Sequence, residues 1–280
     1  MLGTGVCIES WQPVQKAIEE VFKEWGADCG DVDRDLASFL LAQHVYHMRF
    51  SYPDDDLPAE KREHLEREWP NNLRRDEMLK KRIAAKLIEA SDEKKVALDR
   101  RFLEAVEREF EDGKTVVFFT TNWDLLLERS FKPGADTSKV KHLHGSVTEP
   151  RRLYLPTETN EERYRSPDDR QYYGDPISHL WKYVAAAKTL WLYGLSLDPA
   201  DAELAMVIRA GLSEWSETRT IKISARRRDL PGIRKRVSAM VAMAGRQANI
   251  IEDPVDSPRD CPPSRLWRKT LGLKTRPGPL

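Results

Sequence analysis

The sequence is poor in cysteine, has no long apolar run and carries no net charge. Its three cysteines, Cys7, Cys29 and Cys261, lie far apart, so they predict neither a zinc ribbon nor a disulfide framework. No apolar run approaches the ~20 residues that span a bilayer, and residues 1–10 lack the pattern of a secretory signal. With 46 basic and 46 acidic residues, the chain has no global field for nucleic acid or an anionic membrane. These absences predict a cytoplasmic protein with reduced cysteines that binds neither nucleic acid nor a membrane.

The spacing of apolar residues changes along the 280-residue chain, which is 40% hydrophobic and 33% charged. That composition is typical of one large globular domain. Up to Gly113 the apolar residues follow helical spacing. Beyond it, short β-favouring runs alternate with helical stretches, and the expected strands are 115–119, 139–143, 153–155, 189–193, 220–224 and 249–251. This alternation predicts parallel βαβ units and hence an α/β fold with a Rossmann-like, doubly wound parallel sheet.

The domain boundaries follow from the same pattern. We expect residues 1–253 to form the Rossmann-like domain, interrupted by a helical insertion at about 27–113. Residues 254–280 are rich in proline, which predicts an irregular C-terminal tail.

Polar or glycine-containing turns follow three of the expected strands, at residues 120–124, 142–146 and 194–198. Ligands of an open parallel sheet bind at the carboxyl ends of its strands, so we expect the three turns to meet at one edge and form a site. Each turn also has a purely structural interpretation. Asn122 either caps the next helix, with Asp124 in its first turn, or orients a water or a sugar diol. His144 is either a structural histidine or a group that exchanges a proton with a ribose hydroxyl.

These turns resemble three motifs of the sirtuin-like family, and in particular of its bacterial NAD-consuming branch. Residues 120–124 (Thr-Thr-Asn-Trp-Asp) are similar to the family's Thr-Thr-Asn-Tyr-Asp motif, and residues 143–146 to its Leu-His-Gly-Ser motif. Residues 194–197 (Gly-Leu-Ser-Leu) look like the Gly-x-Ser-Leu turn that contacts the cofactor. The motifs occur in the family's order, and the resemblance extends over about 113–204. It implies a sirtuin-like Rossmann domain that takes NAD as its substrate.

Residues 3–7 (Gly-Thr-Gly-Val-Cys) resemble the Gly-Ala-Gly-x-Ser loop with which the family cradles the dinucleotide phosphates. Glycines there let backbone N–H groups approach a pyrophosphate. Cys7 stands in the place of the usual serine, which removes one hydroxyl contact. Only Met1 and Leu2 precede the loop, fewer than the ~5–6 residues of a usual strand. We therefore expect either that the chain begins inside a longer natural protein or that the core of its sheet is compromised.

The resemblance implies hydrolysis of the nicotinamide–ribose bond of NAD, with nicotinamide and ADP-ribose as products. Asn122 would orient a water or the nicotinamide ribose, His144 would bind or deprotonate a ribose hydroxyl, and Asp124 would support the loop. The residues implied to contact the cofactor are Gly3, Thr4, Gly5, Cys7, Thr121, Gly194, Ser196 and Leu197. Deacylating sirtuins carry a zinc module with four cysteines, which three scattered cysteines cannot build, so we expect an NAD glycohydrolase that needs no metal. The resemblance further implies an anti-phage defence effector, with a homo-oligomer or a defence-system protein as its partner.

Two other classes of function stay open. A non-catalytic module would bind NAD or ADP-ribose without turnover, and a transferase would move ADP-ribose or remove an acyl group from a protein. Residues 222–246 contain eight basic residues and one acidic residue, Asp229; this run would face nucleic acid, the adenosine phosphate side of a dinucleotide or, most simply, solvent. His44 and His47 have a spacing that can bind metal, but no carboxylate pattern completes a site, so we expect a solvated helix face.

Overall fold

The computed structural model describes residues 1, 7–8, 11–27, 29–111, 115–130, 139–197 and 201–255. Within these residues the protein is a mixed α/β structure with eight α-helices and small parallel sheets. The sequence prediction of an α/β protein with parallel strands is therefore confirmed at this level. None of the described helices combines the length and the apolar character needed to cross a membrane.

Parallel strands form two small sheets. In the first, β3 (Phe118–Thr120) pairs with β4 (Val140–His142) so that Thr120 lies opposite His142. In the second, β6 (Arg219–Arg226) lies between β5 (Thr189–Tyr193) and β7 (Ala248–Val255). The apolar strand β3 is buried at all three of its positions, as expected for a strand covered on both faces, whereas most positions of β7 are exposed or half-buried. The predicted tail lies outside the described residues, except that its first two residues belong to β7.

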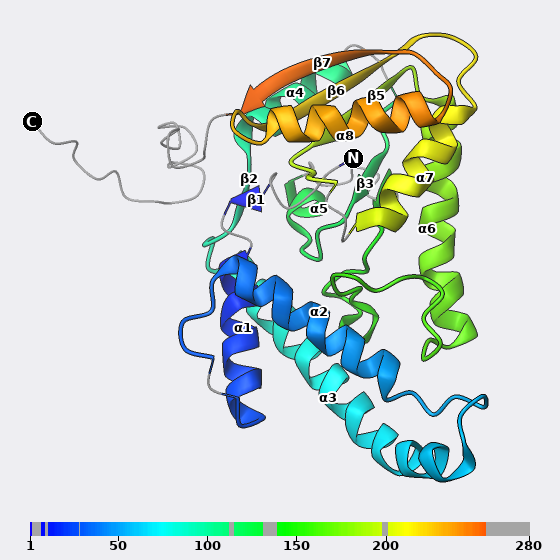
Figure 1. Ribbon diagram of the computed structural model, residues 1–280. Coiled ribbons are helices and arrows are strands. Elements are labelled where there is room, and N and C mark those ends of the chain that lie inside the picture. The colour runs from blue at the N-terminus through cyan, green and yellow to red at the C-terminus, as the bar shows by residue number, and fades with distance from the viewer. Residues whose placement is uncertain are drawn as a thin grey trace, which may run out of the picture.

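Helices α6 (Pro167–Ala186), α7 (Ala202–Ser213) and α8 (Leu230–Met243) cover the sheets. Figure 1 shows α8 lying along the three-stranded sheet, with α6 and α7 side by side next to it. Gly211 of α7 lets the two helices approach closely, because a Cβ there would lie 2.7 Å from the side chain of Val184. The side chains of these helices and strands form one continuous hydrophobic core.

A separate layer of helices comprises α1 (Trp11–Glu24), α2 (Arg34–Phe50) and the 34-residue α3 (Ala59–Asp92). It lies on one side of the sheets and has its own core (Figure 1). Helix α4 (Arg100–Glu111) follows β2 (Ala97–Leu98), which pairs antiparallel with β1 (Cys7–Ile8). The described residues within 27–113 hold α2, α3, α4 and the short β2, and the helical layer also includes α1.

Residues 153–155 do not form the strand that the sequence predicted. All three side chains are buried, as in a strand, but the backbone bonds to a neighbouring turn: Tyr154 N–H donates to the carbonyl of His144 at 2.9 Å. An apolar run predicts that its side chains are buried, and buried side chains occur both in strands and in packed loops.

Met1 lies beside β5. Tyr193 N–H donates to its carbonyl oxygen at 2.9 Å, and its amino group donates to the carbonyl of Trp191 at 2.5 Å. Burial lowers the pKa of that amino group to about 5. The glycine-rich loop at residues 3–5 lies outside the described residues.

Candidate functional site

A cleft of about 1000 Å³ lies between the helical layer and the carboxyl ends of the strands. Trp11 of α1 and Phe39 of α2 contribute to one wall. The turns that follow β3, β4, β5 and β6 form the opposite wall. Six of the sequence-predicted site residues line this one cleft: Thr121, Asn122, Asp124, His144, Gly194 and Ser196.

The turn after β3 is held by side chains at both of its ends. Thr120 Oγ1 accepts the N–H of Asn122 at 3.0 Å, and Asp124 Oδ1 accepts the N–H of Leu126 at 3.0 Å. Leu126 is the first residue of α5 (Leu126–Ser130), so Asp124 makes the helix-capping bond that the sequence offered to Asn122. Asn122 and Asp124 are both buried at the bottom of the cleft. The carboxylate therefore fixes the loop that carries the carboxamide.

The turn after β4 packs against the β3 turn. Val147 N–H donates to the carbonyl of Trp123 at 2.8 Å, which joins the two turns through their backbones. Gly145 adopts φ +71°, and a Cβ at this position would lie 2.0 Å from the carbonyl oxygen of Arg152. Only glycine fits here, both for its conformation and for its lack of a side chain. The sharp turn aims the preceding His144 into the cleft.

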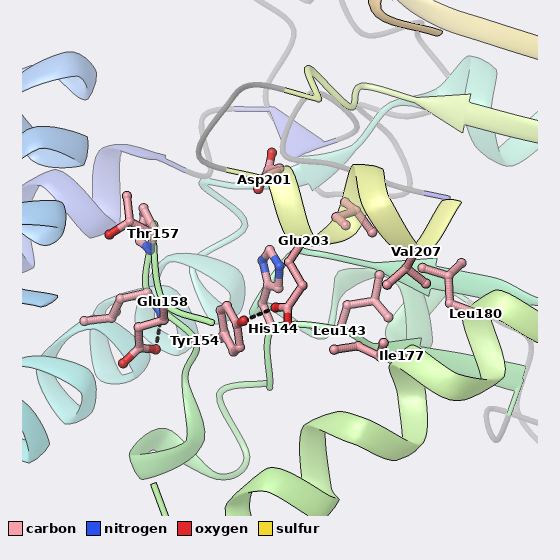
Figure 2. Close-up of a pocket in the computed structure, with 13 residues that line it drawn as sticks. Leu143, His144, Tyr154, Thr157, Glu158, Ile177, Leu180, Asp201, Glu203 and Val207 are labelled. Atoms are coloured by element: carbon pink, nitrogen blue, oxygen red, sulfur yellow. Dashed lines mark hydrogen bonds between the residues drawn. The ribbon is translucent and has the colours of Figure 1, made fainter. Parts of the chain in front are cut away.

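His144 is half-buried and stacks on Tyr154. The ring centroids are 5.0 Å apart and the planes are 8° from parallel. Burial first, and the charge of Arg165 second, lower the pKa of His144 to about 4. The imidazole is therefore neutral at physiological pH and offers an unprotonated nitrogen as a hydrogen-bond acceptor, while the low pKa makes it a weaker base than a free histidine. Tyr154 is held in turn because its hydroxyl donates to Glu203 (Figure 2).

A small cavity of about 30 Å³ adjoins the cleft at His144. Leu143, Ile177, Leu180 and Val207 form its apolar side, and Figure 2 shows them facing His144 and Glu203. A volume of this size accommodates a water molecule between polar groups. The arrangement therefore offers a place for a water beside a neutral imidazole.

Thr157 lines both the cleft and the small cavity. It adopts φ +73°, which is uncommon for a β-branched residue. Its hydroxyl oxygen is buried and has no hydrogen-bond partner in the part of the chain that the structure describes. Strained backbone and an unsatisfied buried hydroxyl together are typical of ligand sites. The sequence contains no signal that singles out this threonine.

His142 is a second residue that sequence reasoning did not assign. Its Nδ1 donates to the carbonyl of Asn122 at 2.9 Å, and its Nε2 lies 2.6 Å from Oε1 of Glu128. Burial opposes protonation, but the contacts with Glu128 and with the carbonyl of Asn122 raise the pKa of His142. The bond to Glu128 orients the imidazole of His142, and its Nδ1 in turn holds the carbonyl of Asn122. The role of His142 depends on its position opposite Thr120. That position follows from the register of the two strands, which the sequence does not show.

A buried cluster of charges connects the helical layer to the site. Lys80 Nζ lies 3.0 Å from Asp76 and 3.3 Å from Glu158, and Glu158 accepts from Arg165 at 2.8 Å. The Arg165 guanidinium lies 4.2 Å from the ring centroid of Tyr154. Burial disfavours the charged form of Lys80, but Asp76 and Glu158 raise its pKa. A chain of contacts therefore connects α3, through Lys80, Glu158 and Arg165, to the ring of Tyr154 on which His144 stacks.

His44 belongs to this cluster, and the prediction of a solvated helix face is wrong for it. His44 is buried, and its Nε2 lies 3.0 Å from Asp76. Burial raises the pKa of Asp76, but Lys80 and His44 together lower it to about 2. His47, one turn away, is exposed and contacts Asn72 at 3.3 Å. Among the described residues, no group of three or more His, Cys, Asp or Glu side chains is arranged to hold a metal.

The turn after β5 contributes its backbone to the cleft. Gly194 adopts φ +62°, and its N–H donates to the carbonyl of Ser224 at 2.8 Å. Leu197 also has a positive φ, +54°, and its side chain is buried in the main core. Leu197 does not line the cleft, unlike Gly194 and Ser196.

The predicted phosphate loop is described only in part. Gly3, Thr4 and Gly5 lie outside the described residues, and the backbone of Cys7 pairs with Leu98 in the antiparallel β1–β2 ladder. No family model, curated protein or solved structure matches this chain. The site is therefore interpreted from its own residues and geometry.

Proposed function

We propose that the protein hydrolyses NAD at its nicotinamide–ribose bond and releases nicotinamide and ADP-ribose. One observation carries the proposal: Asn122 and His144, which follow two paired parallel strands, line the same cleft of about 1000 Å³. A cleft of that volume suits a ligand as large as a dinucleotide. Parallel strands with helices on their faces also support a Rossmann-like, doubly wound sheet as the scaffold.

The residues of the cleft suit both steps of this reaction, cleavage of the nicotinamide–ribose bond and addition of water. The C–N bond between nicotinamide and ribose breaks, its electron pair leaves with the nicotinamide, and water adds to the ribose carbon. Asn122 orients the nicotinamide ribose or the attacking water, while Thr120 and His142 bond to its backbone. Asp124 supports the loop through its bond to Leu126 N–H. His144 is neutral because its pKa is about 4, which also makes it a weak base. It therefore binds a ribose hydroxyl or the water, and accepts the proton only as the water adds to the ribose carbon and becomes acidic. Fixed dipoles around an oxocarbenium-like transition state supply part of its stabilisation.

The test is release of nicotinamide from NAD by the purified full chain. Asn122→Ala and His144→Ala are each expected to lower the rate by at least a hundredfold. The matched controls are Asn249→Ala and His179→Ala, since both side chains are exposed and neither lines the cleft. Unchanged turnover in the two cleft variants would overturn the assignment.

The other two functions appear as distinct outcomes of the same assay. A binding module would hold NAD and leave it intact, and a transferase would require an added protein acceptor. The anti-phage role implied by the resemblance predicts that expression of the active chain depletes cellular NAD. His144→Ala would then abolish the depletion while leaving protein levels unchanged.

A further inference from the structure

The turn between β6 and α8 forms part of the cleft wall and is strongly basic. Arg226, Arg228 and Arg236 line the cleft there. The side chain of Arg226 makes no hydrogen bond or ion pair within the described part of the chain. Arg228 lies 3.7 Å from Asp229, and Nε of Arg236 donates to the carbonyl of Ser196 at 3.0 Å. Guanidinium groups match the geometry of a phosphate, so arginines that line a cleft suit a phosphate ligand.

The start of α8 adds backbone donors to the same place. This 14-residue helix begins at Leu230, and Asp229 at its N-cap makes no side-chain capping bond. Gly232 and Ile233 of the first turn line the cleft. The first N–H groups of a helix have no partner within it and carry the positive end of its dipole, so they attract anions. Two independent features, the arginines and the uncapped helix start, therefore meet at one end of the cleft.

The other carboxylate near this turn is engaged elsewhere. Asp253 of β7 accepts from Ser224 Oγ at 2.9 Å and pairs with Lys222 at 3.1 Å. Dinucleotide sites that select an unmodified adenosine ribose place a carboxylate at such a strand end to bind the 2′-hydroxyl, whereas an arginine accommodates a 2′-phosphate. Here the three residues that follow Ala225 are arginines.

The β6 turn lies where the far half of a dinucleotide would reach. Asn122 and His144 follow β3 and β4, and the Gly194–Ser196 turn follows β5, which is hydrogen-bonded to β6. Adjacent strands are ~4.8 Å apart, so the ends of β5 and β6 are neighbours. A dinucleotide with its nicotinamide ribose at His144 would run past Gly194 and bring its adenosine half to Arg226 and Arg228.

We infer that the β6–α8 turn is a subsite for a phosphate monoester on the adenosine ribose, so that the substrate is NADP in preference to NAD. The inference rests on the proposed function for the direction in which the dinucleotide lies. The phosphate is held by Arg226 and Arg228 and by N–H groups of the first turn of α8, to which Pro231 contributes none.

The first experiment measures binding without turnover. Isothermal titration calorimetry compares adenosine 2′,5′-bisphosphate with 5′-AMP on the full chain. We expect the bisphosphate to bind at least tenfold more tightly. Arg226→Gln and Arg228→Gln should each remove most of that difference. Arg227→Gln should keep it, because all three arginines are exposed but Arg227 does not line the cleft.

The second experiment compares kcat/KM for nicotinamide release from NADP and from NAD. We expect NADP to be preferred at least tenfold, and Arg226→Gln to lower kcat/KM for NADP at least fivefold more than kcat/KM for NAD. Equal use of both substrates, with both rates lowered by Arg226→Gln, would mean that the arginines bind the shared pyrophosphate and would overturn the inference. Selective binding of the bisphosphate with no release of nicotinamide would instead sink the proposed function and leave the phosphate subsite standing.

Discussion

The imidazole of His144 lies parallel to the phenol ring of Tyr154, with 5.0 Å between the ring centroids. Stacking fixes the plane of the imidazole and so determines where its nitrogens point in the cleft. Tyr154 is itself anchored by its hydroxyl contact with Glu203 and by the guanidinium of Arg165. The orientation of the proposed base therefore depends on the ring of Tyr154, which also lines the cleft.

Replacing Tyr154 tests that dependence. Tyr154→Leu removes the ring, and we expect nicotinamide release to fall at least tenfold because His144 loses its fixed plane. Tyr154→Phe keeps the ring and should stay within about threefold of the wild-type rate. Thermal unfolding of both variants provides the control for stability. Equal activity in the two variants would show that the stack does not position the imidazole.

The low pKa of His144 predicts an unusual pH profile. Because the pKa is about 4, nicotinamide release should be flat from pH 8 to near pH 5 and fall at lower pH as the imidazole is protonated. Arg165→Met removes one cause of the shift and should move the acidic limb to higher pH, while Arg165→Lys should leave it nearly in place. The measurement is kcat/KM as a function of pH, and a limb that does not move in Arg165→Met would contradict the electrostatic role of Arg165.

The same shift has a consequence for stability. The usual pKa of histidine is 6.5 and that of folded His144 is about 4. As the pH falls below 6.5, the unfolded chain takes up a proton that the folded chain refuses. His144 therefore lowers the free energy of unfolding progressively between these two pH values. His144→Phe should flatten this part of the curve in chemical denaturation.

Gly145→Ala should destabilise the protein through two causes. The positive φ costs free energy for any residue with a Cβ, and the added carbon would lie 2.0 Å from the carbonyl oxygen of Arg152. We expect the free energy of unfolding to fall by about 3 kcal/mol. Gly245→Ala is the matched control, since it has φ +67° and nothing within 4 Å, and should cost about 1 kcal/mol. Equal losses in the two variants would show that the turn relaxes around the new side chain.

Lys80→Met should be among the most damaging single substitutions in the helical layer. It leaves Asp76 and Glu158 buried with one cation fewer, which we expect to cost about 3–5 kcal/mol. The neighbouring Lys81 pairs with Glu77 at 3.0 Å on the exposed face of the same helix, and Lys81→Met should cost less than about 0.5 kcal/mol. Urea denaturation of the two variants measures the difference. A small loss in Lys80→Met would indicate that water reaches the cluster.

The sequence was informative where one residue type has one structural use. The apolar runs around Phe119, Leu192 and Ile223 predicted buried strands, and β3, β5 and β6 lie there. The polar turns at Asn122, His144 and Gly194 were predicted to meet, and all three line the cleft. Glycines and polar residues directly after apolar runs are strong signals because they depend only on neighbours in the chain.

What the sequence could not supply depends on contacts between distant segments. The pairing of His142 with Glu128 needs the register of β4 against the β3 turn. The cluster around Lys80 brings α2, α3 and the loop before α6 together across 78 residues between Lys80 and Glu158. The helix face that carries His44 was interpreted as solvated because most such faces are, and the burial of His44 is set by tertiary packing.

The buried charges of this cluster constrain how the protein can diverge. Each member balances another inside the fold, so a lone substitution at any of them exposes its neighbour to a large desolvation cost. Replacing these residues one at a time would therefore pass through strongly destabilised proteins. Homologous chains should either keep His44, Asp76, Lys80, Glu158 and Arg165 as a set or have exchanged the whole set for apolar residues.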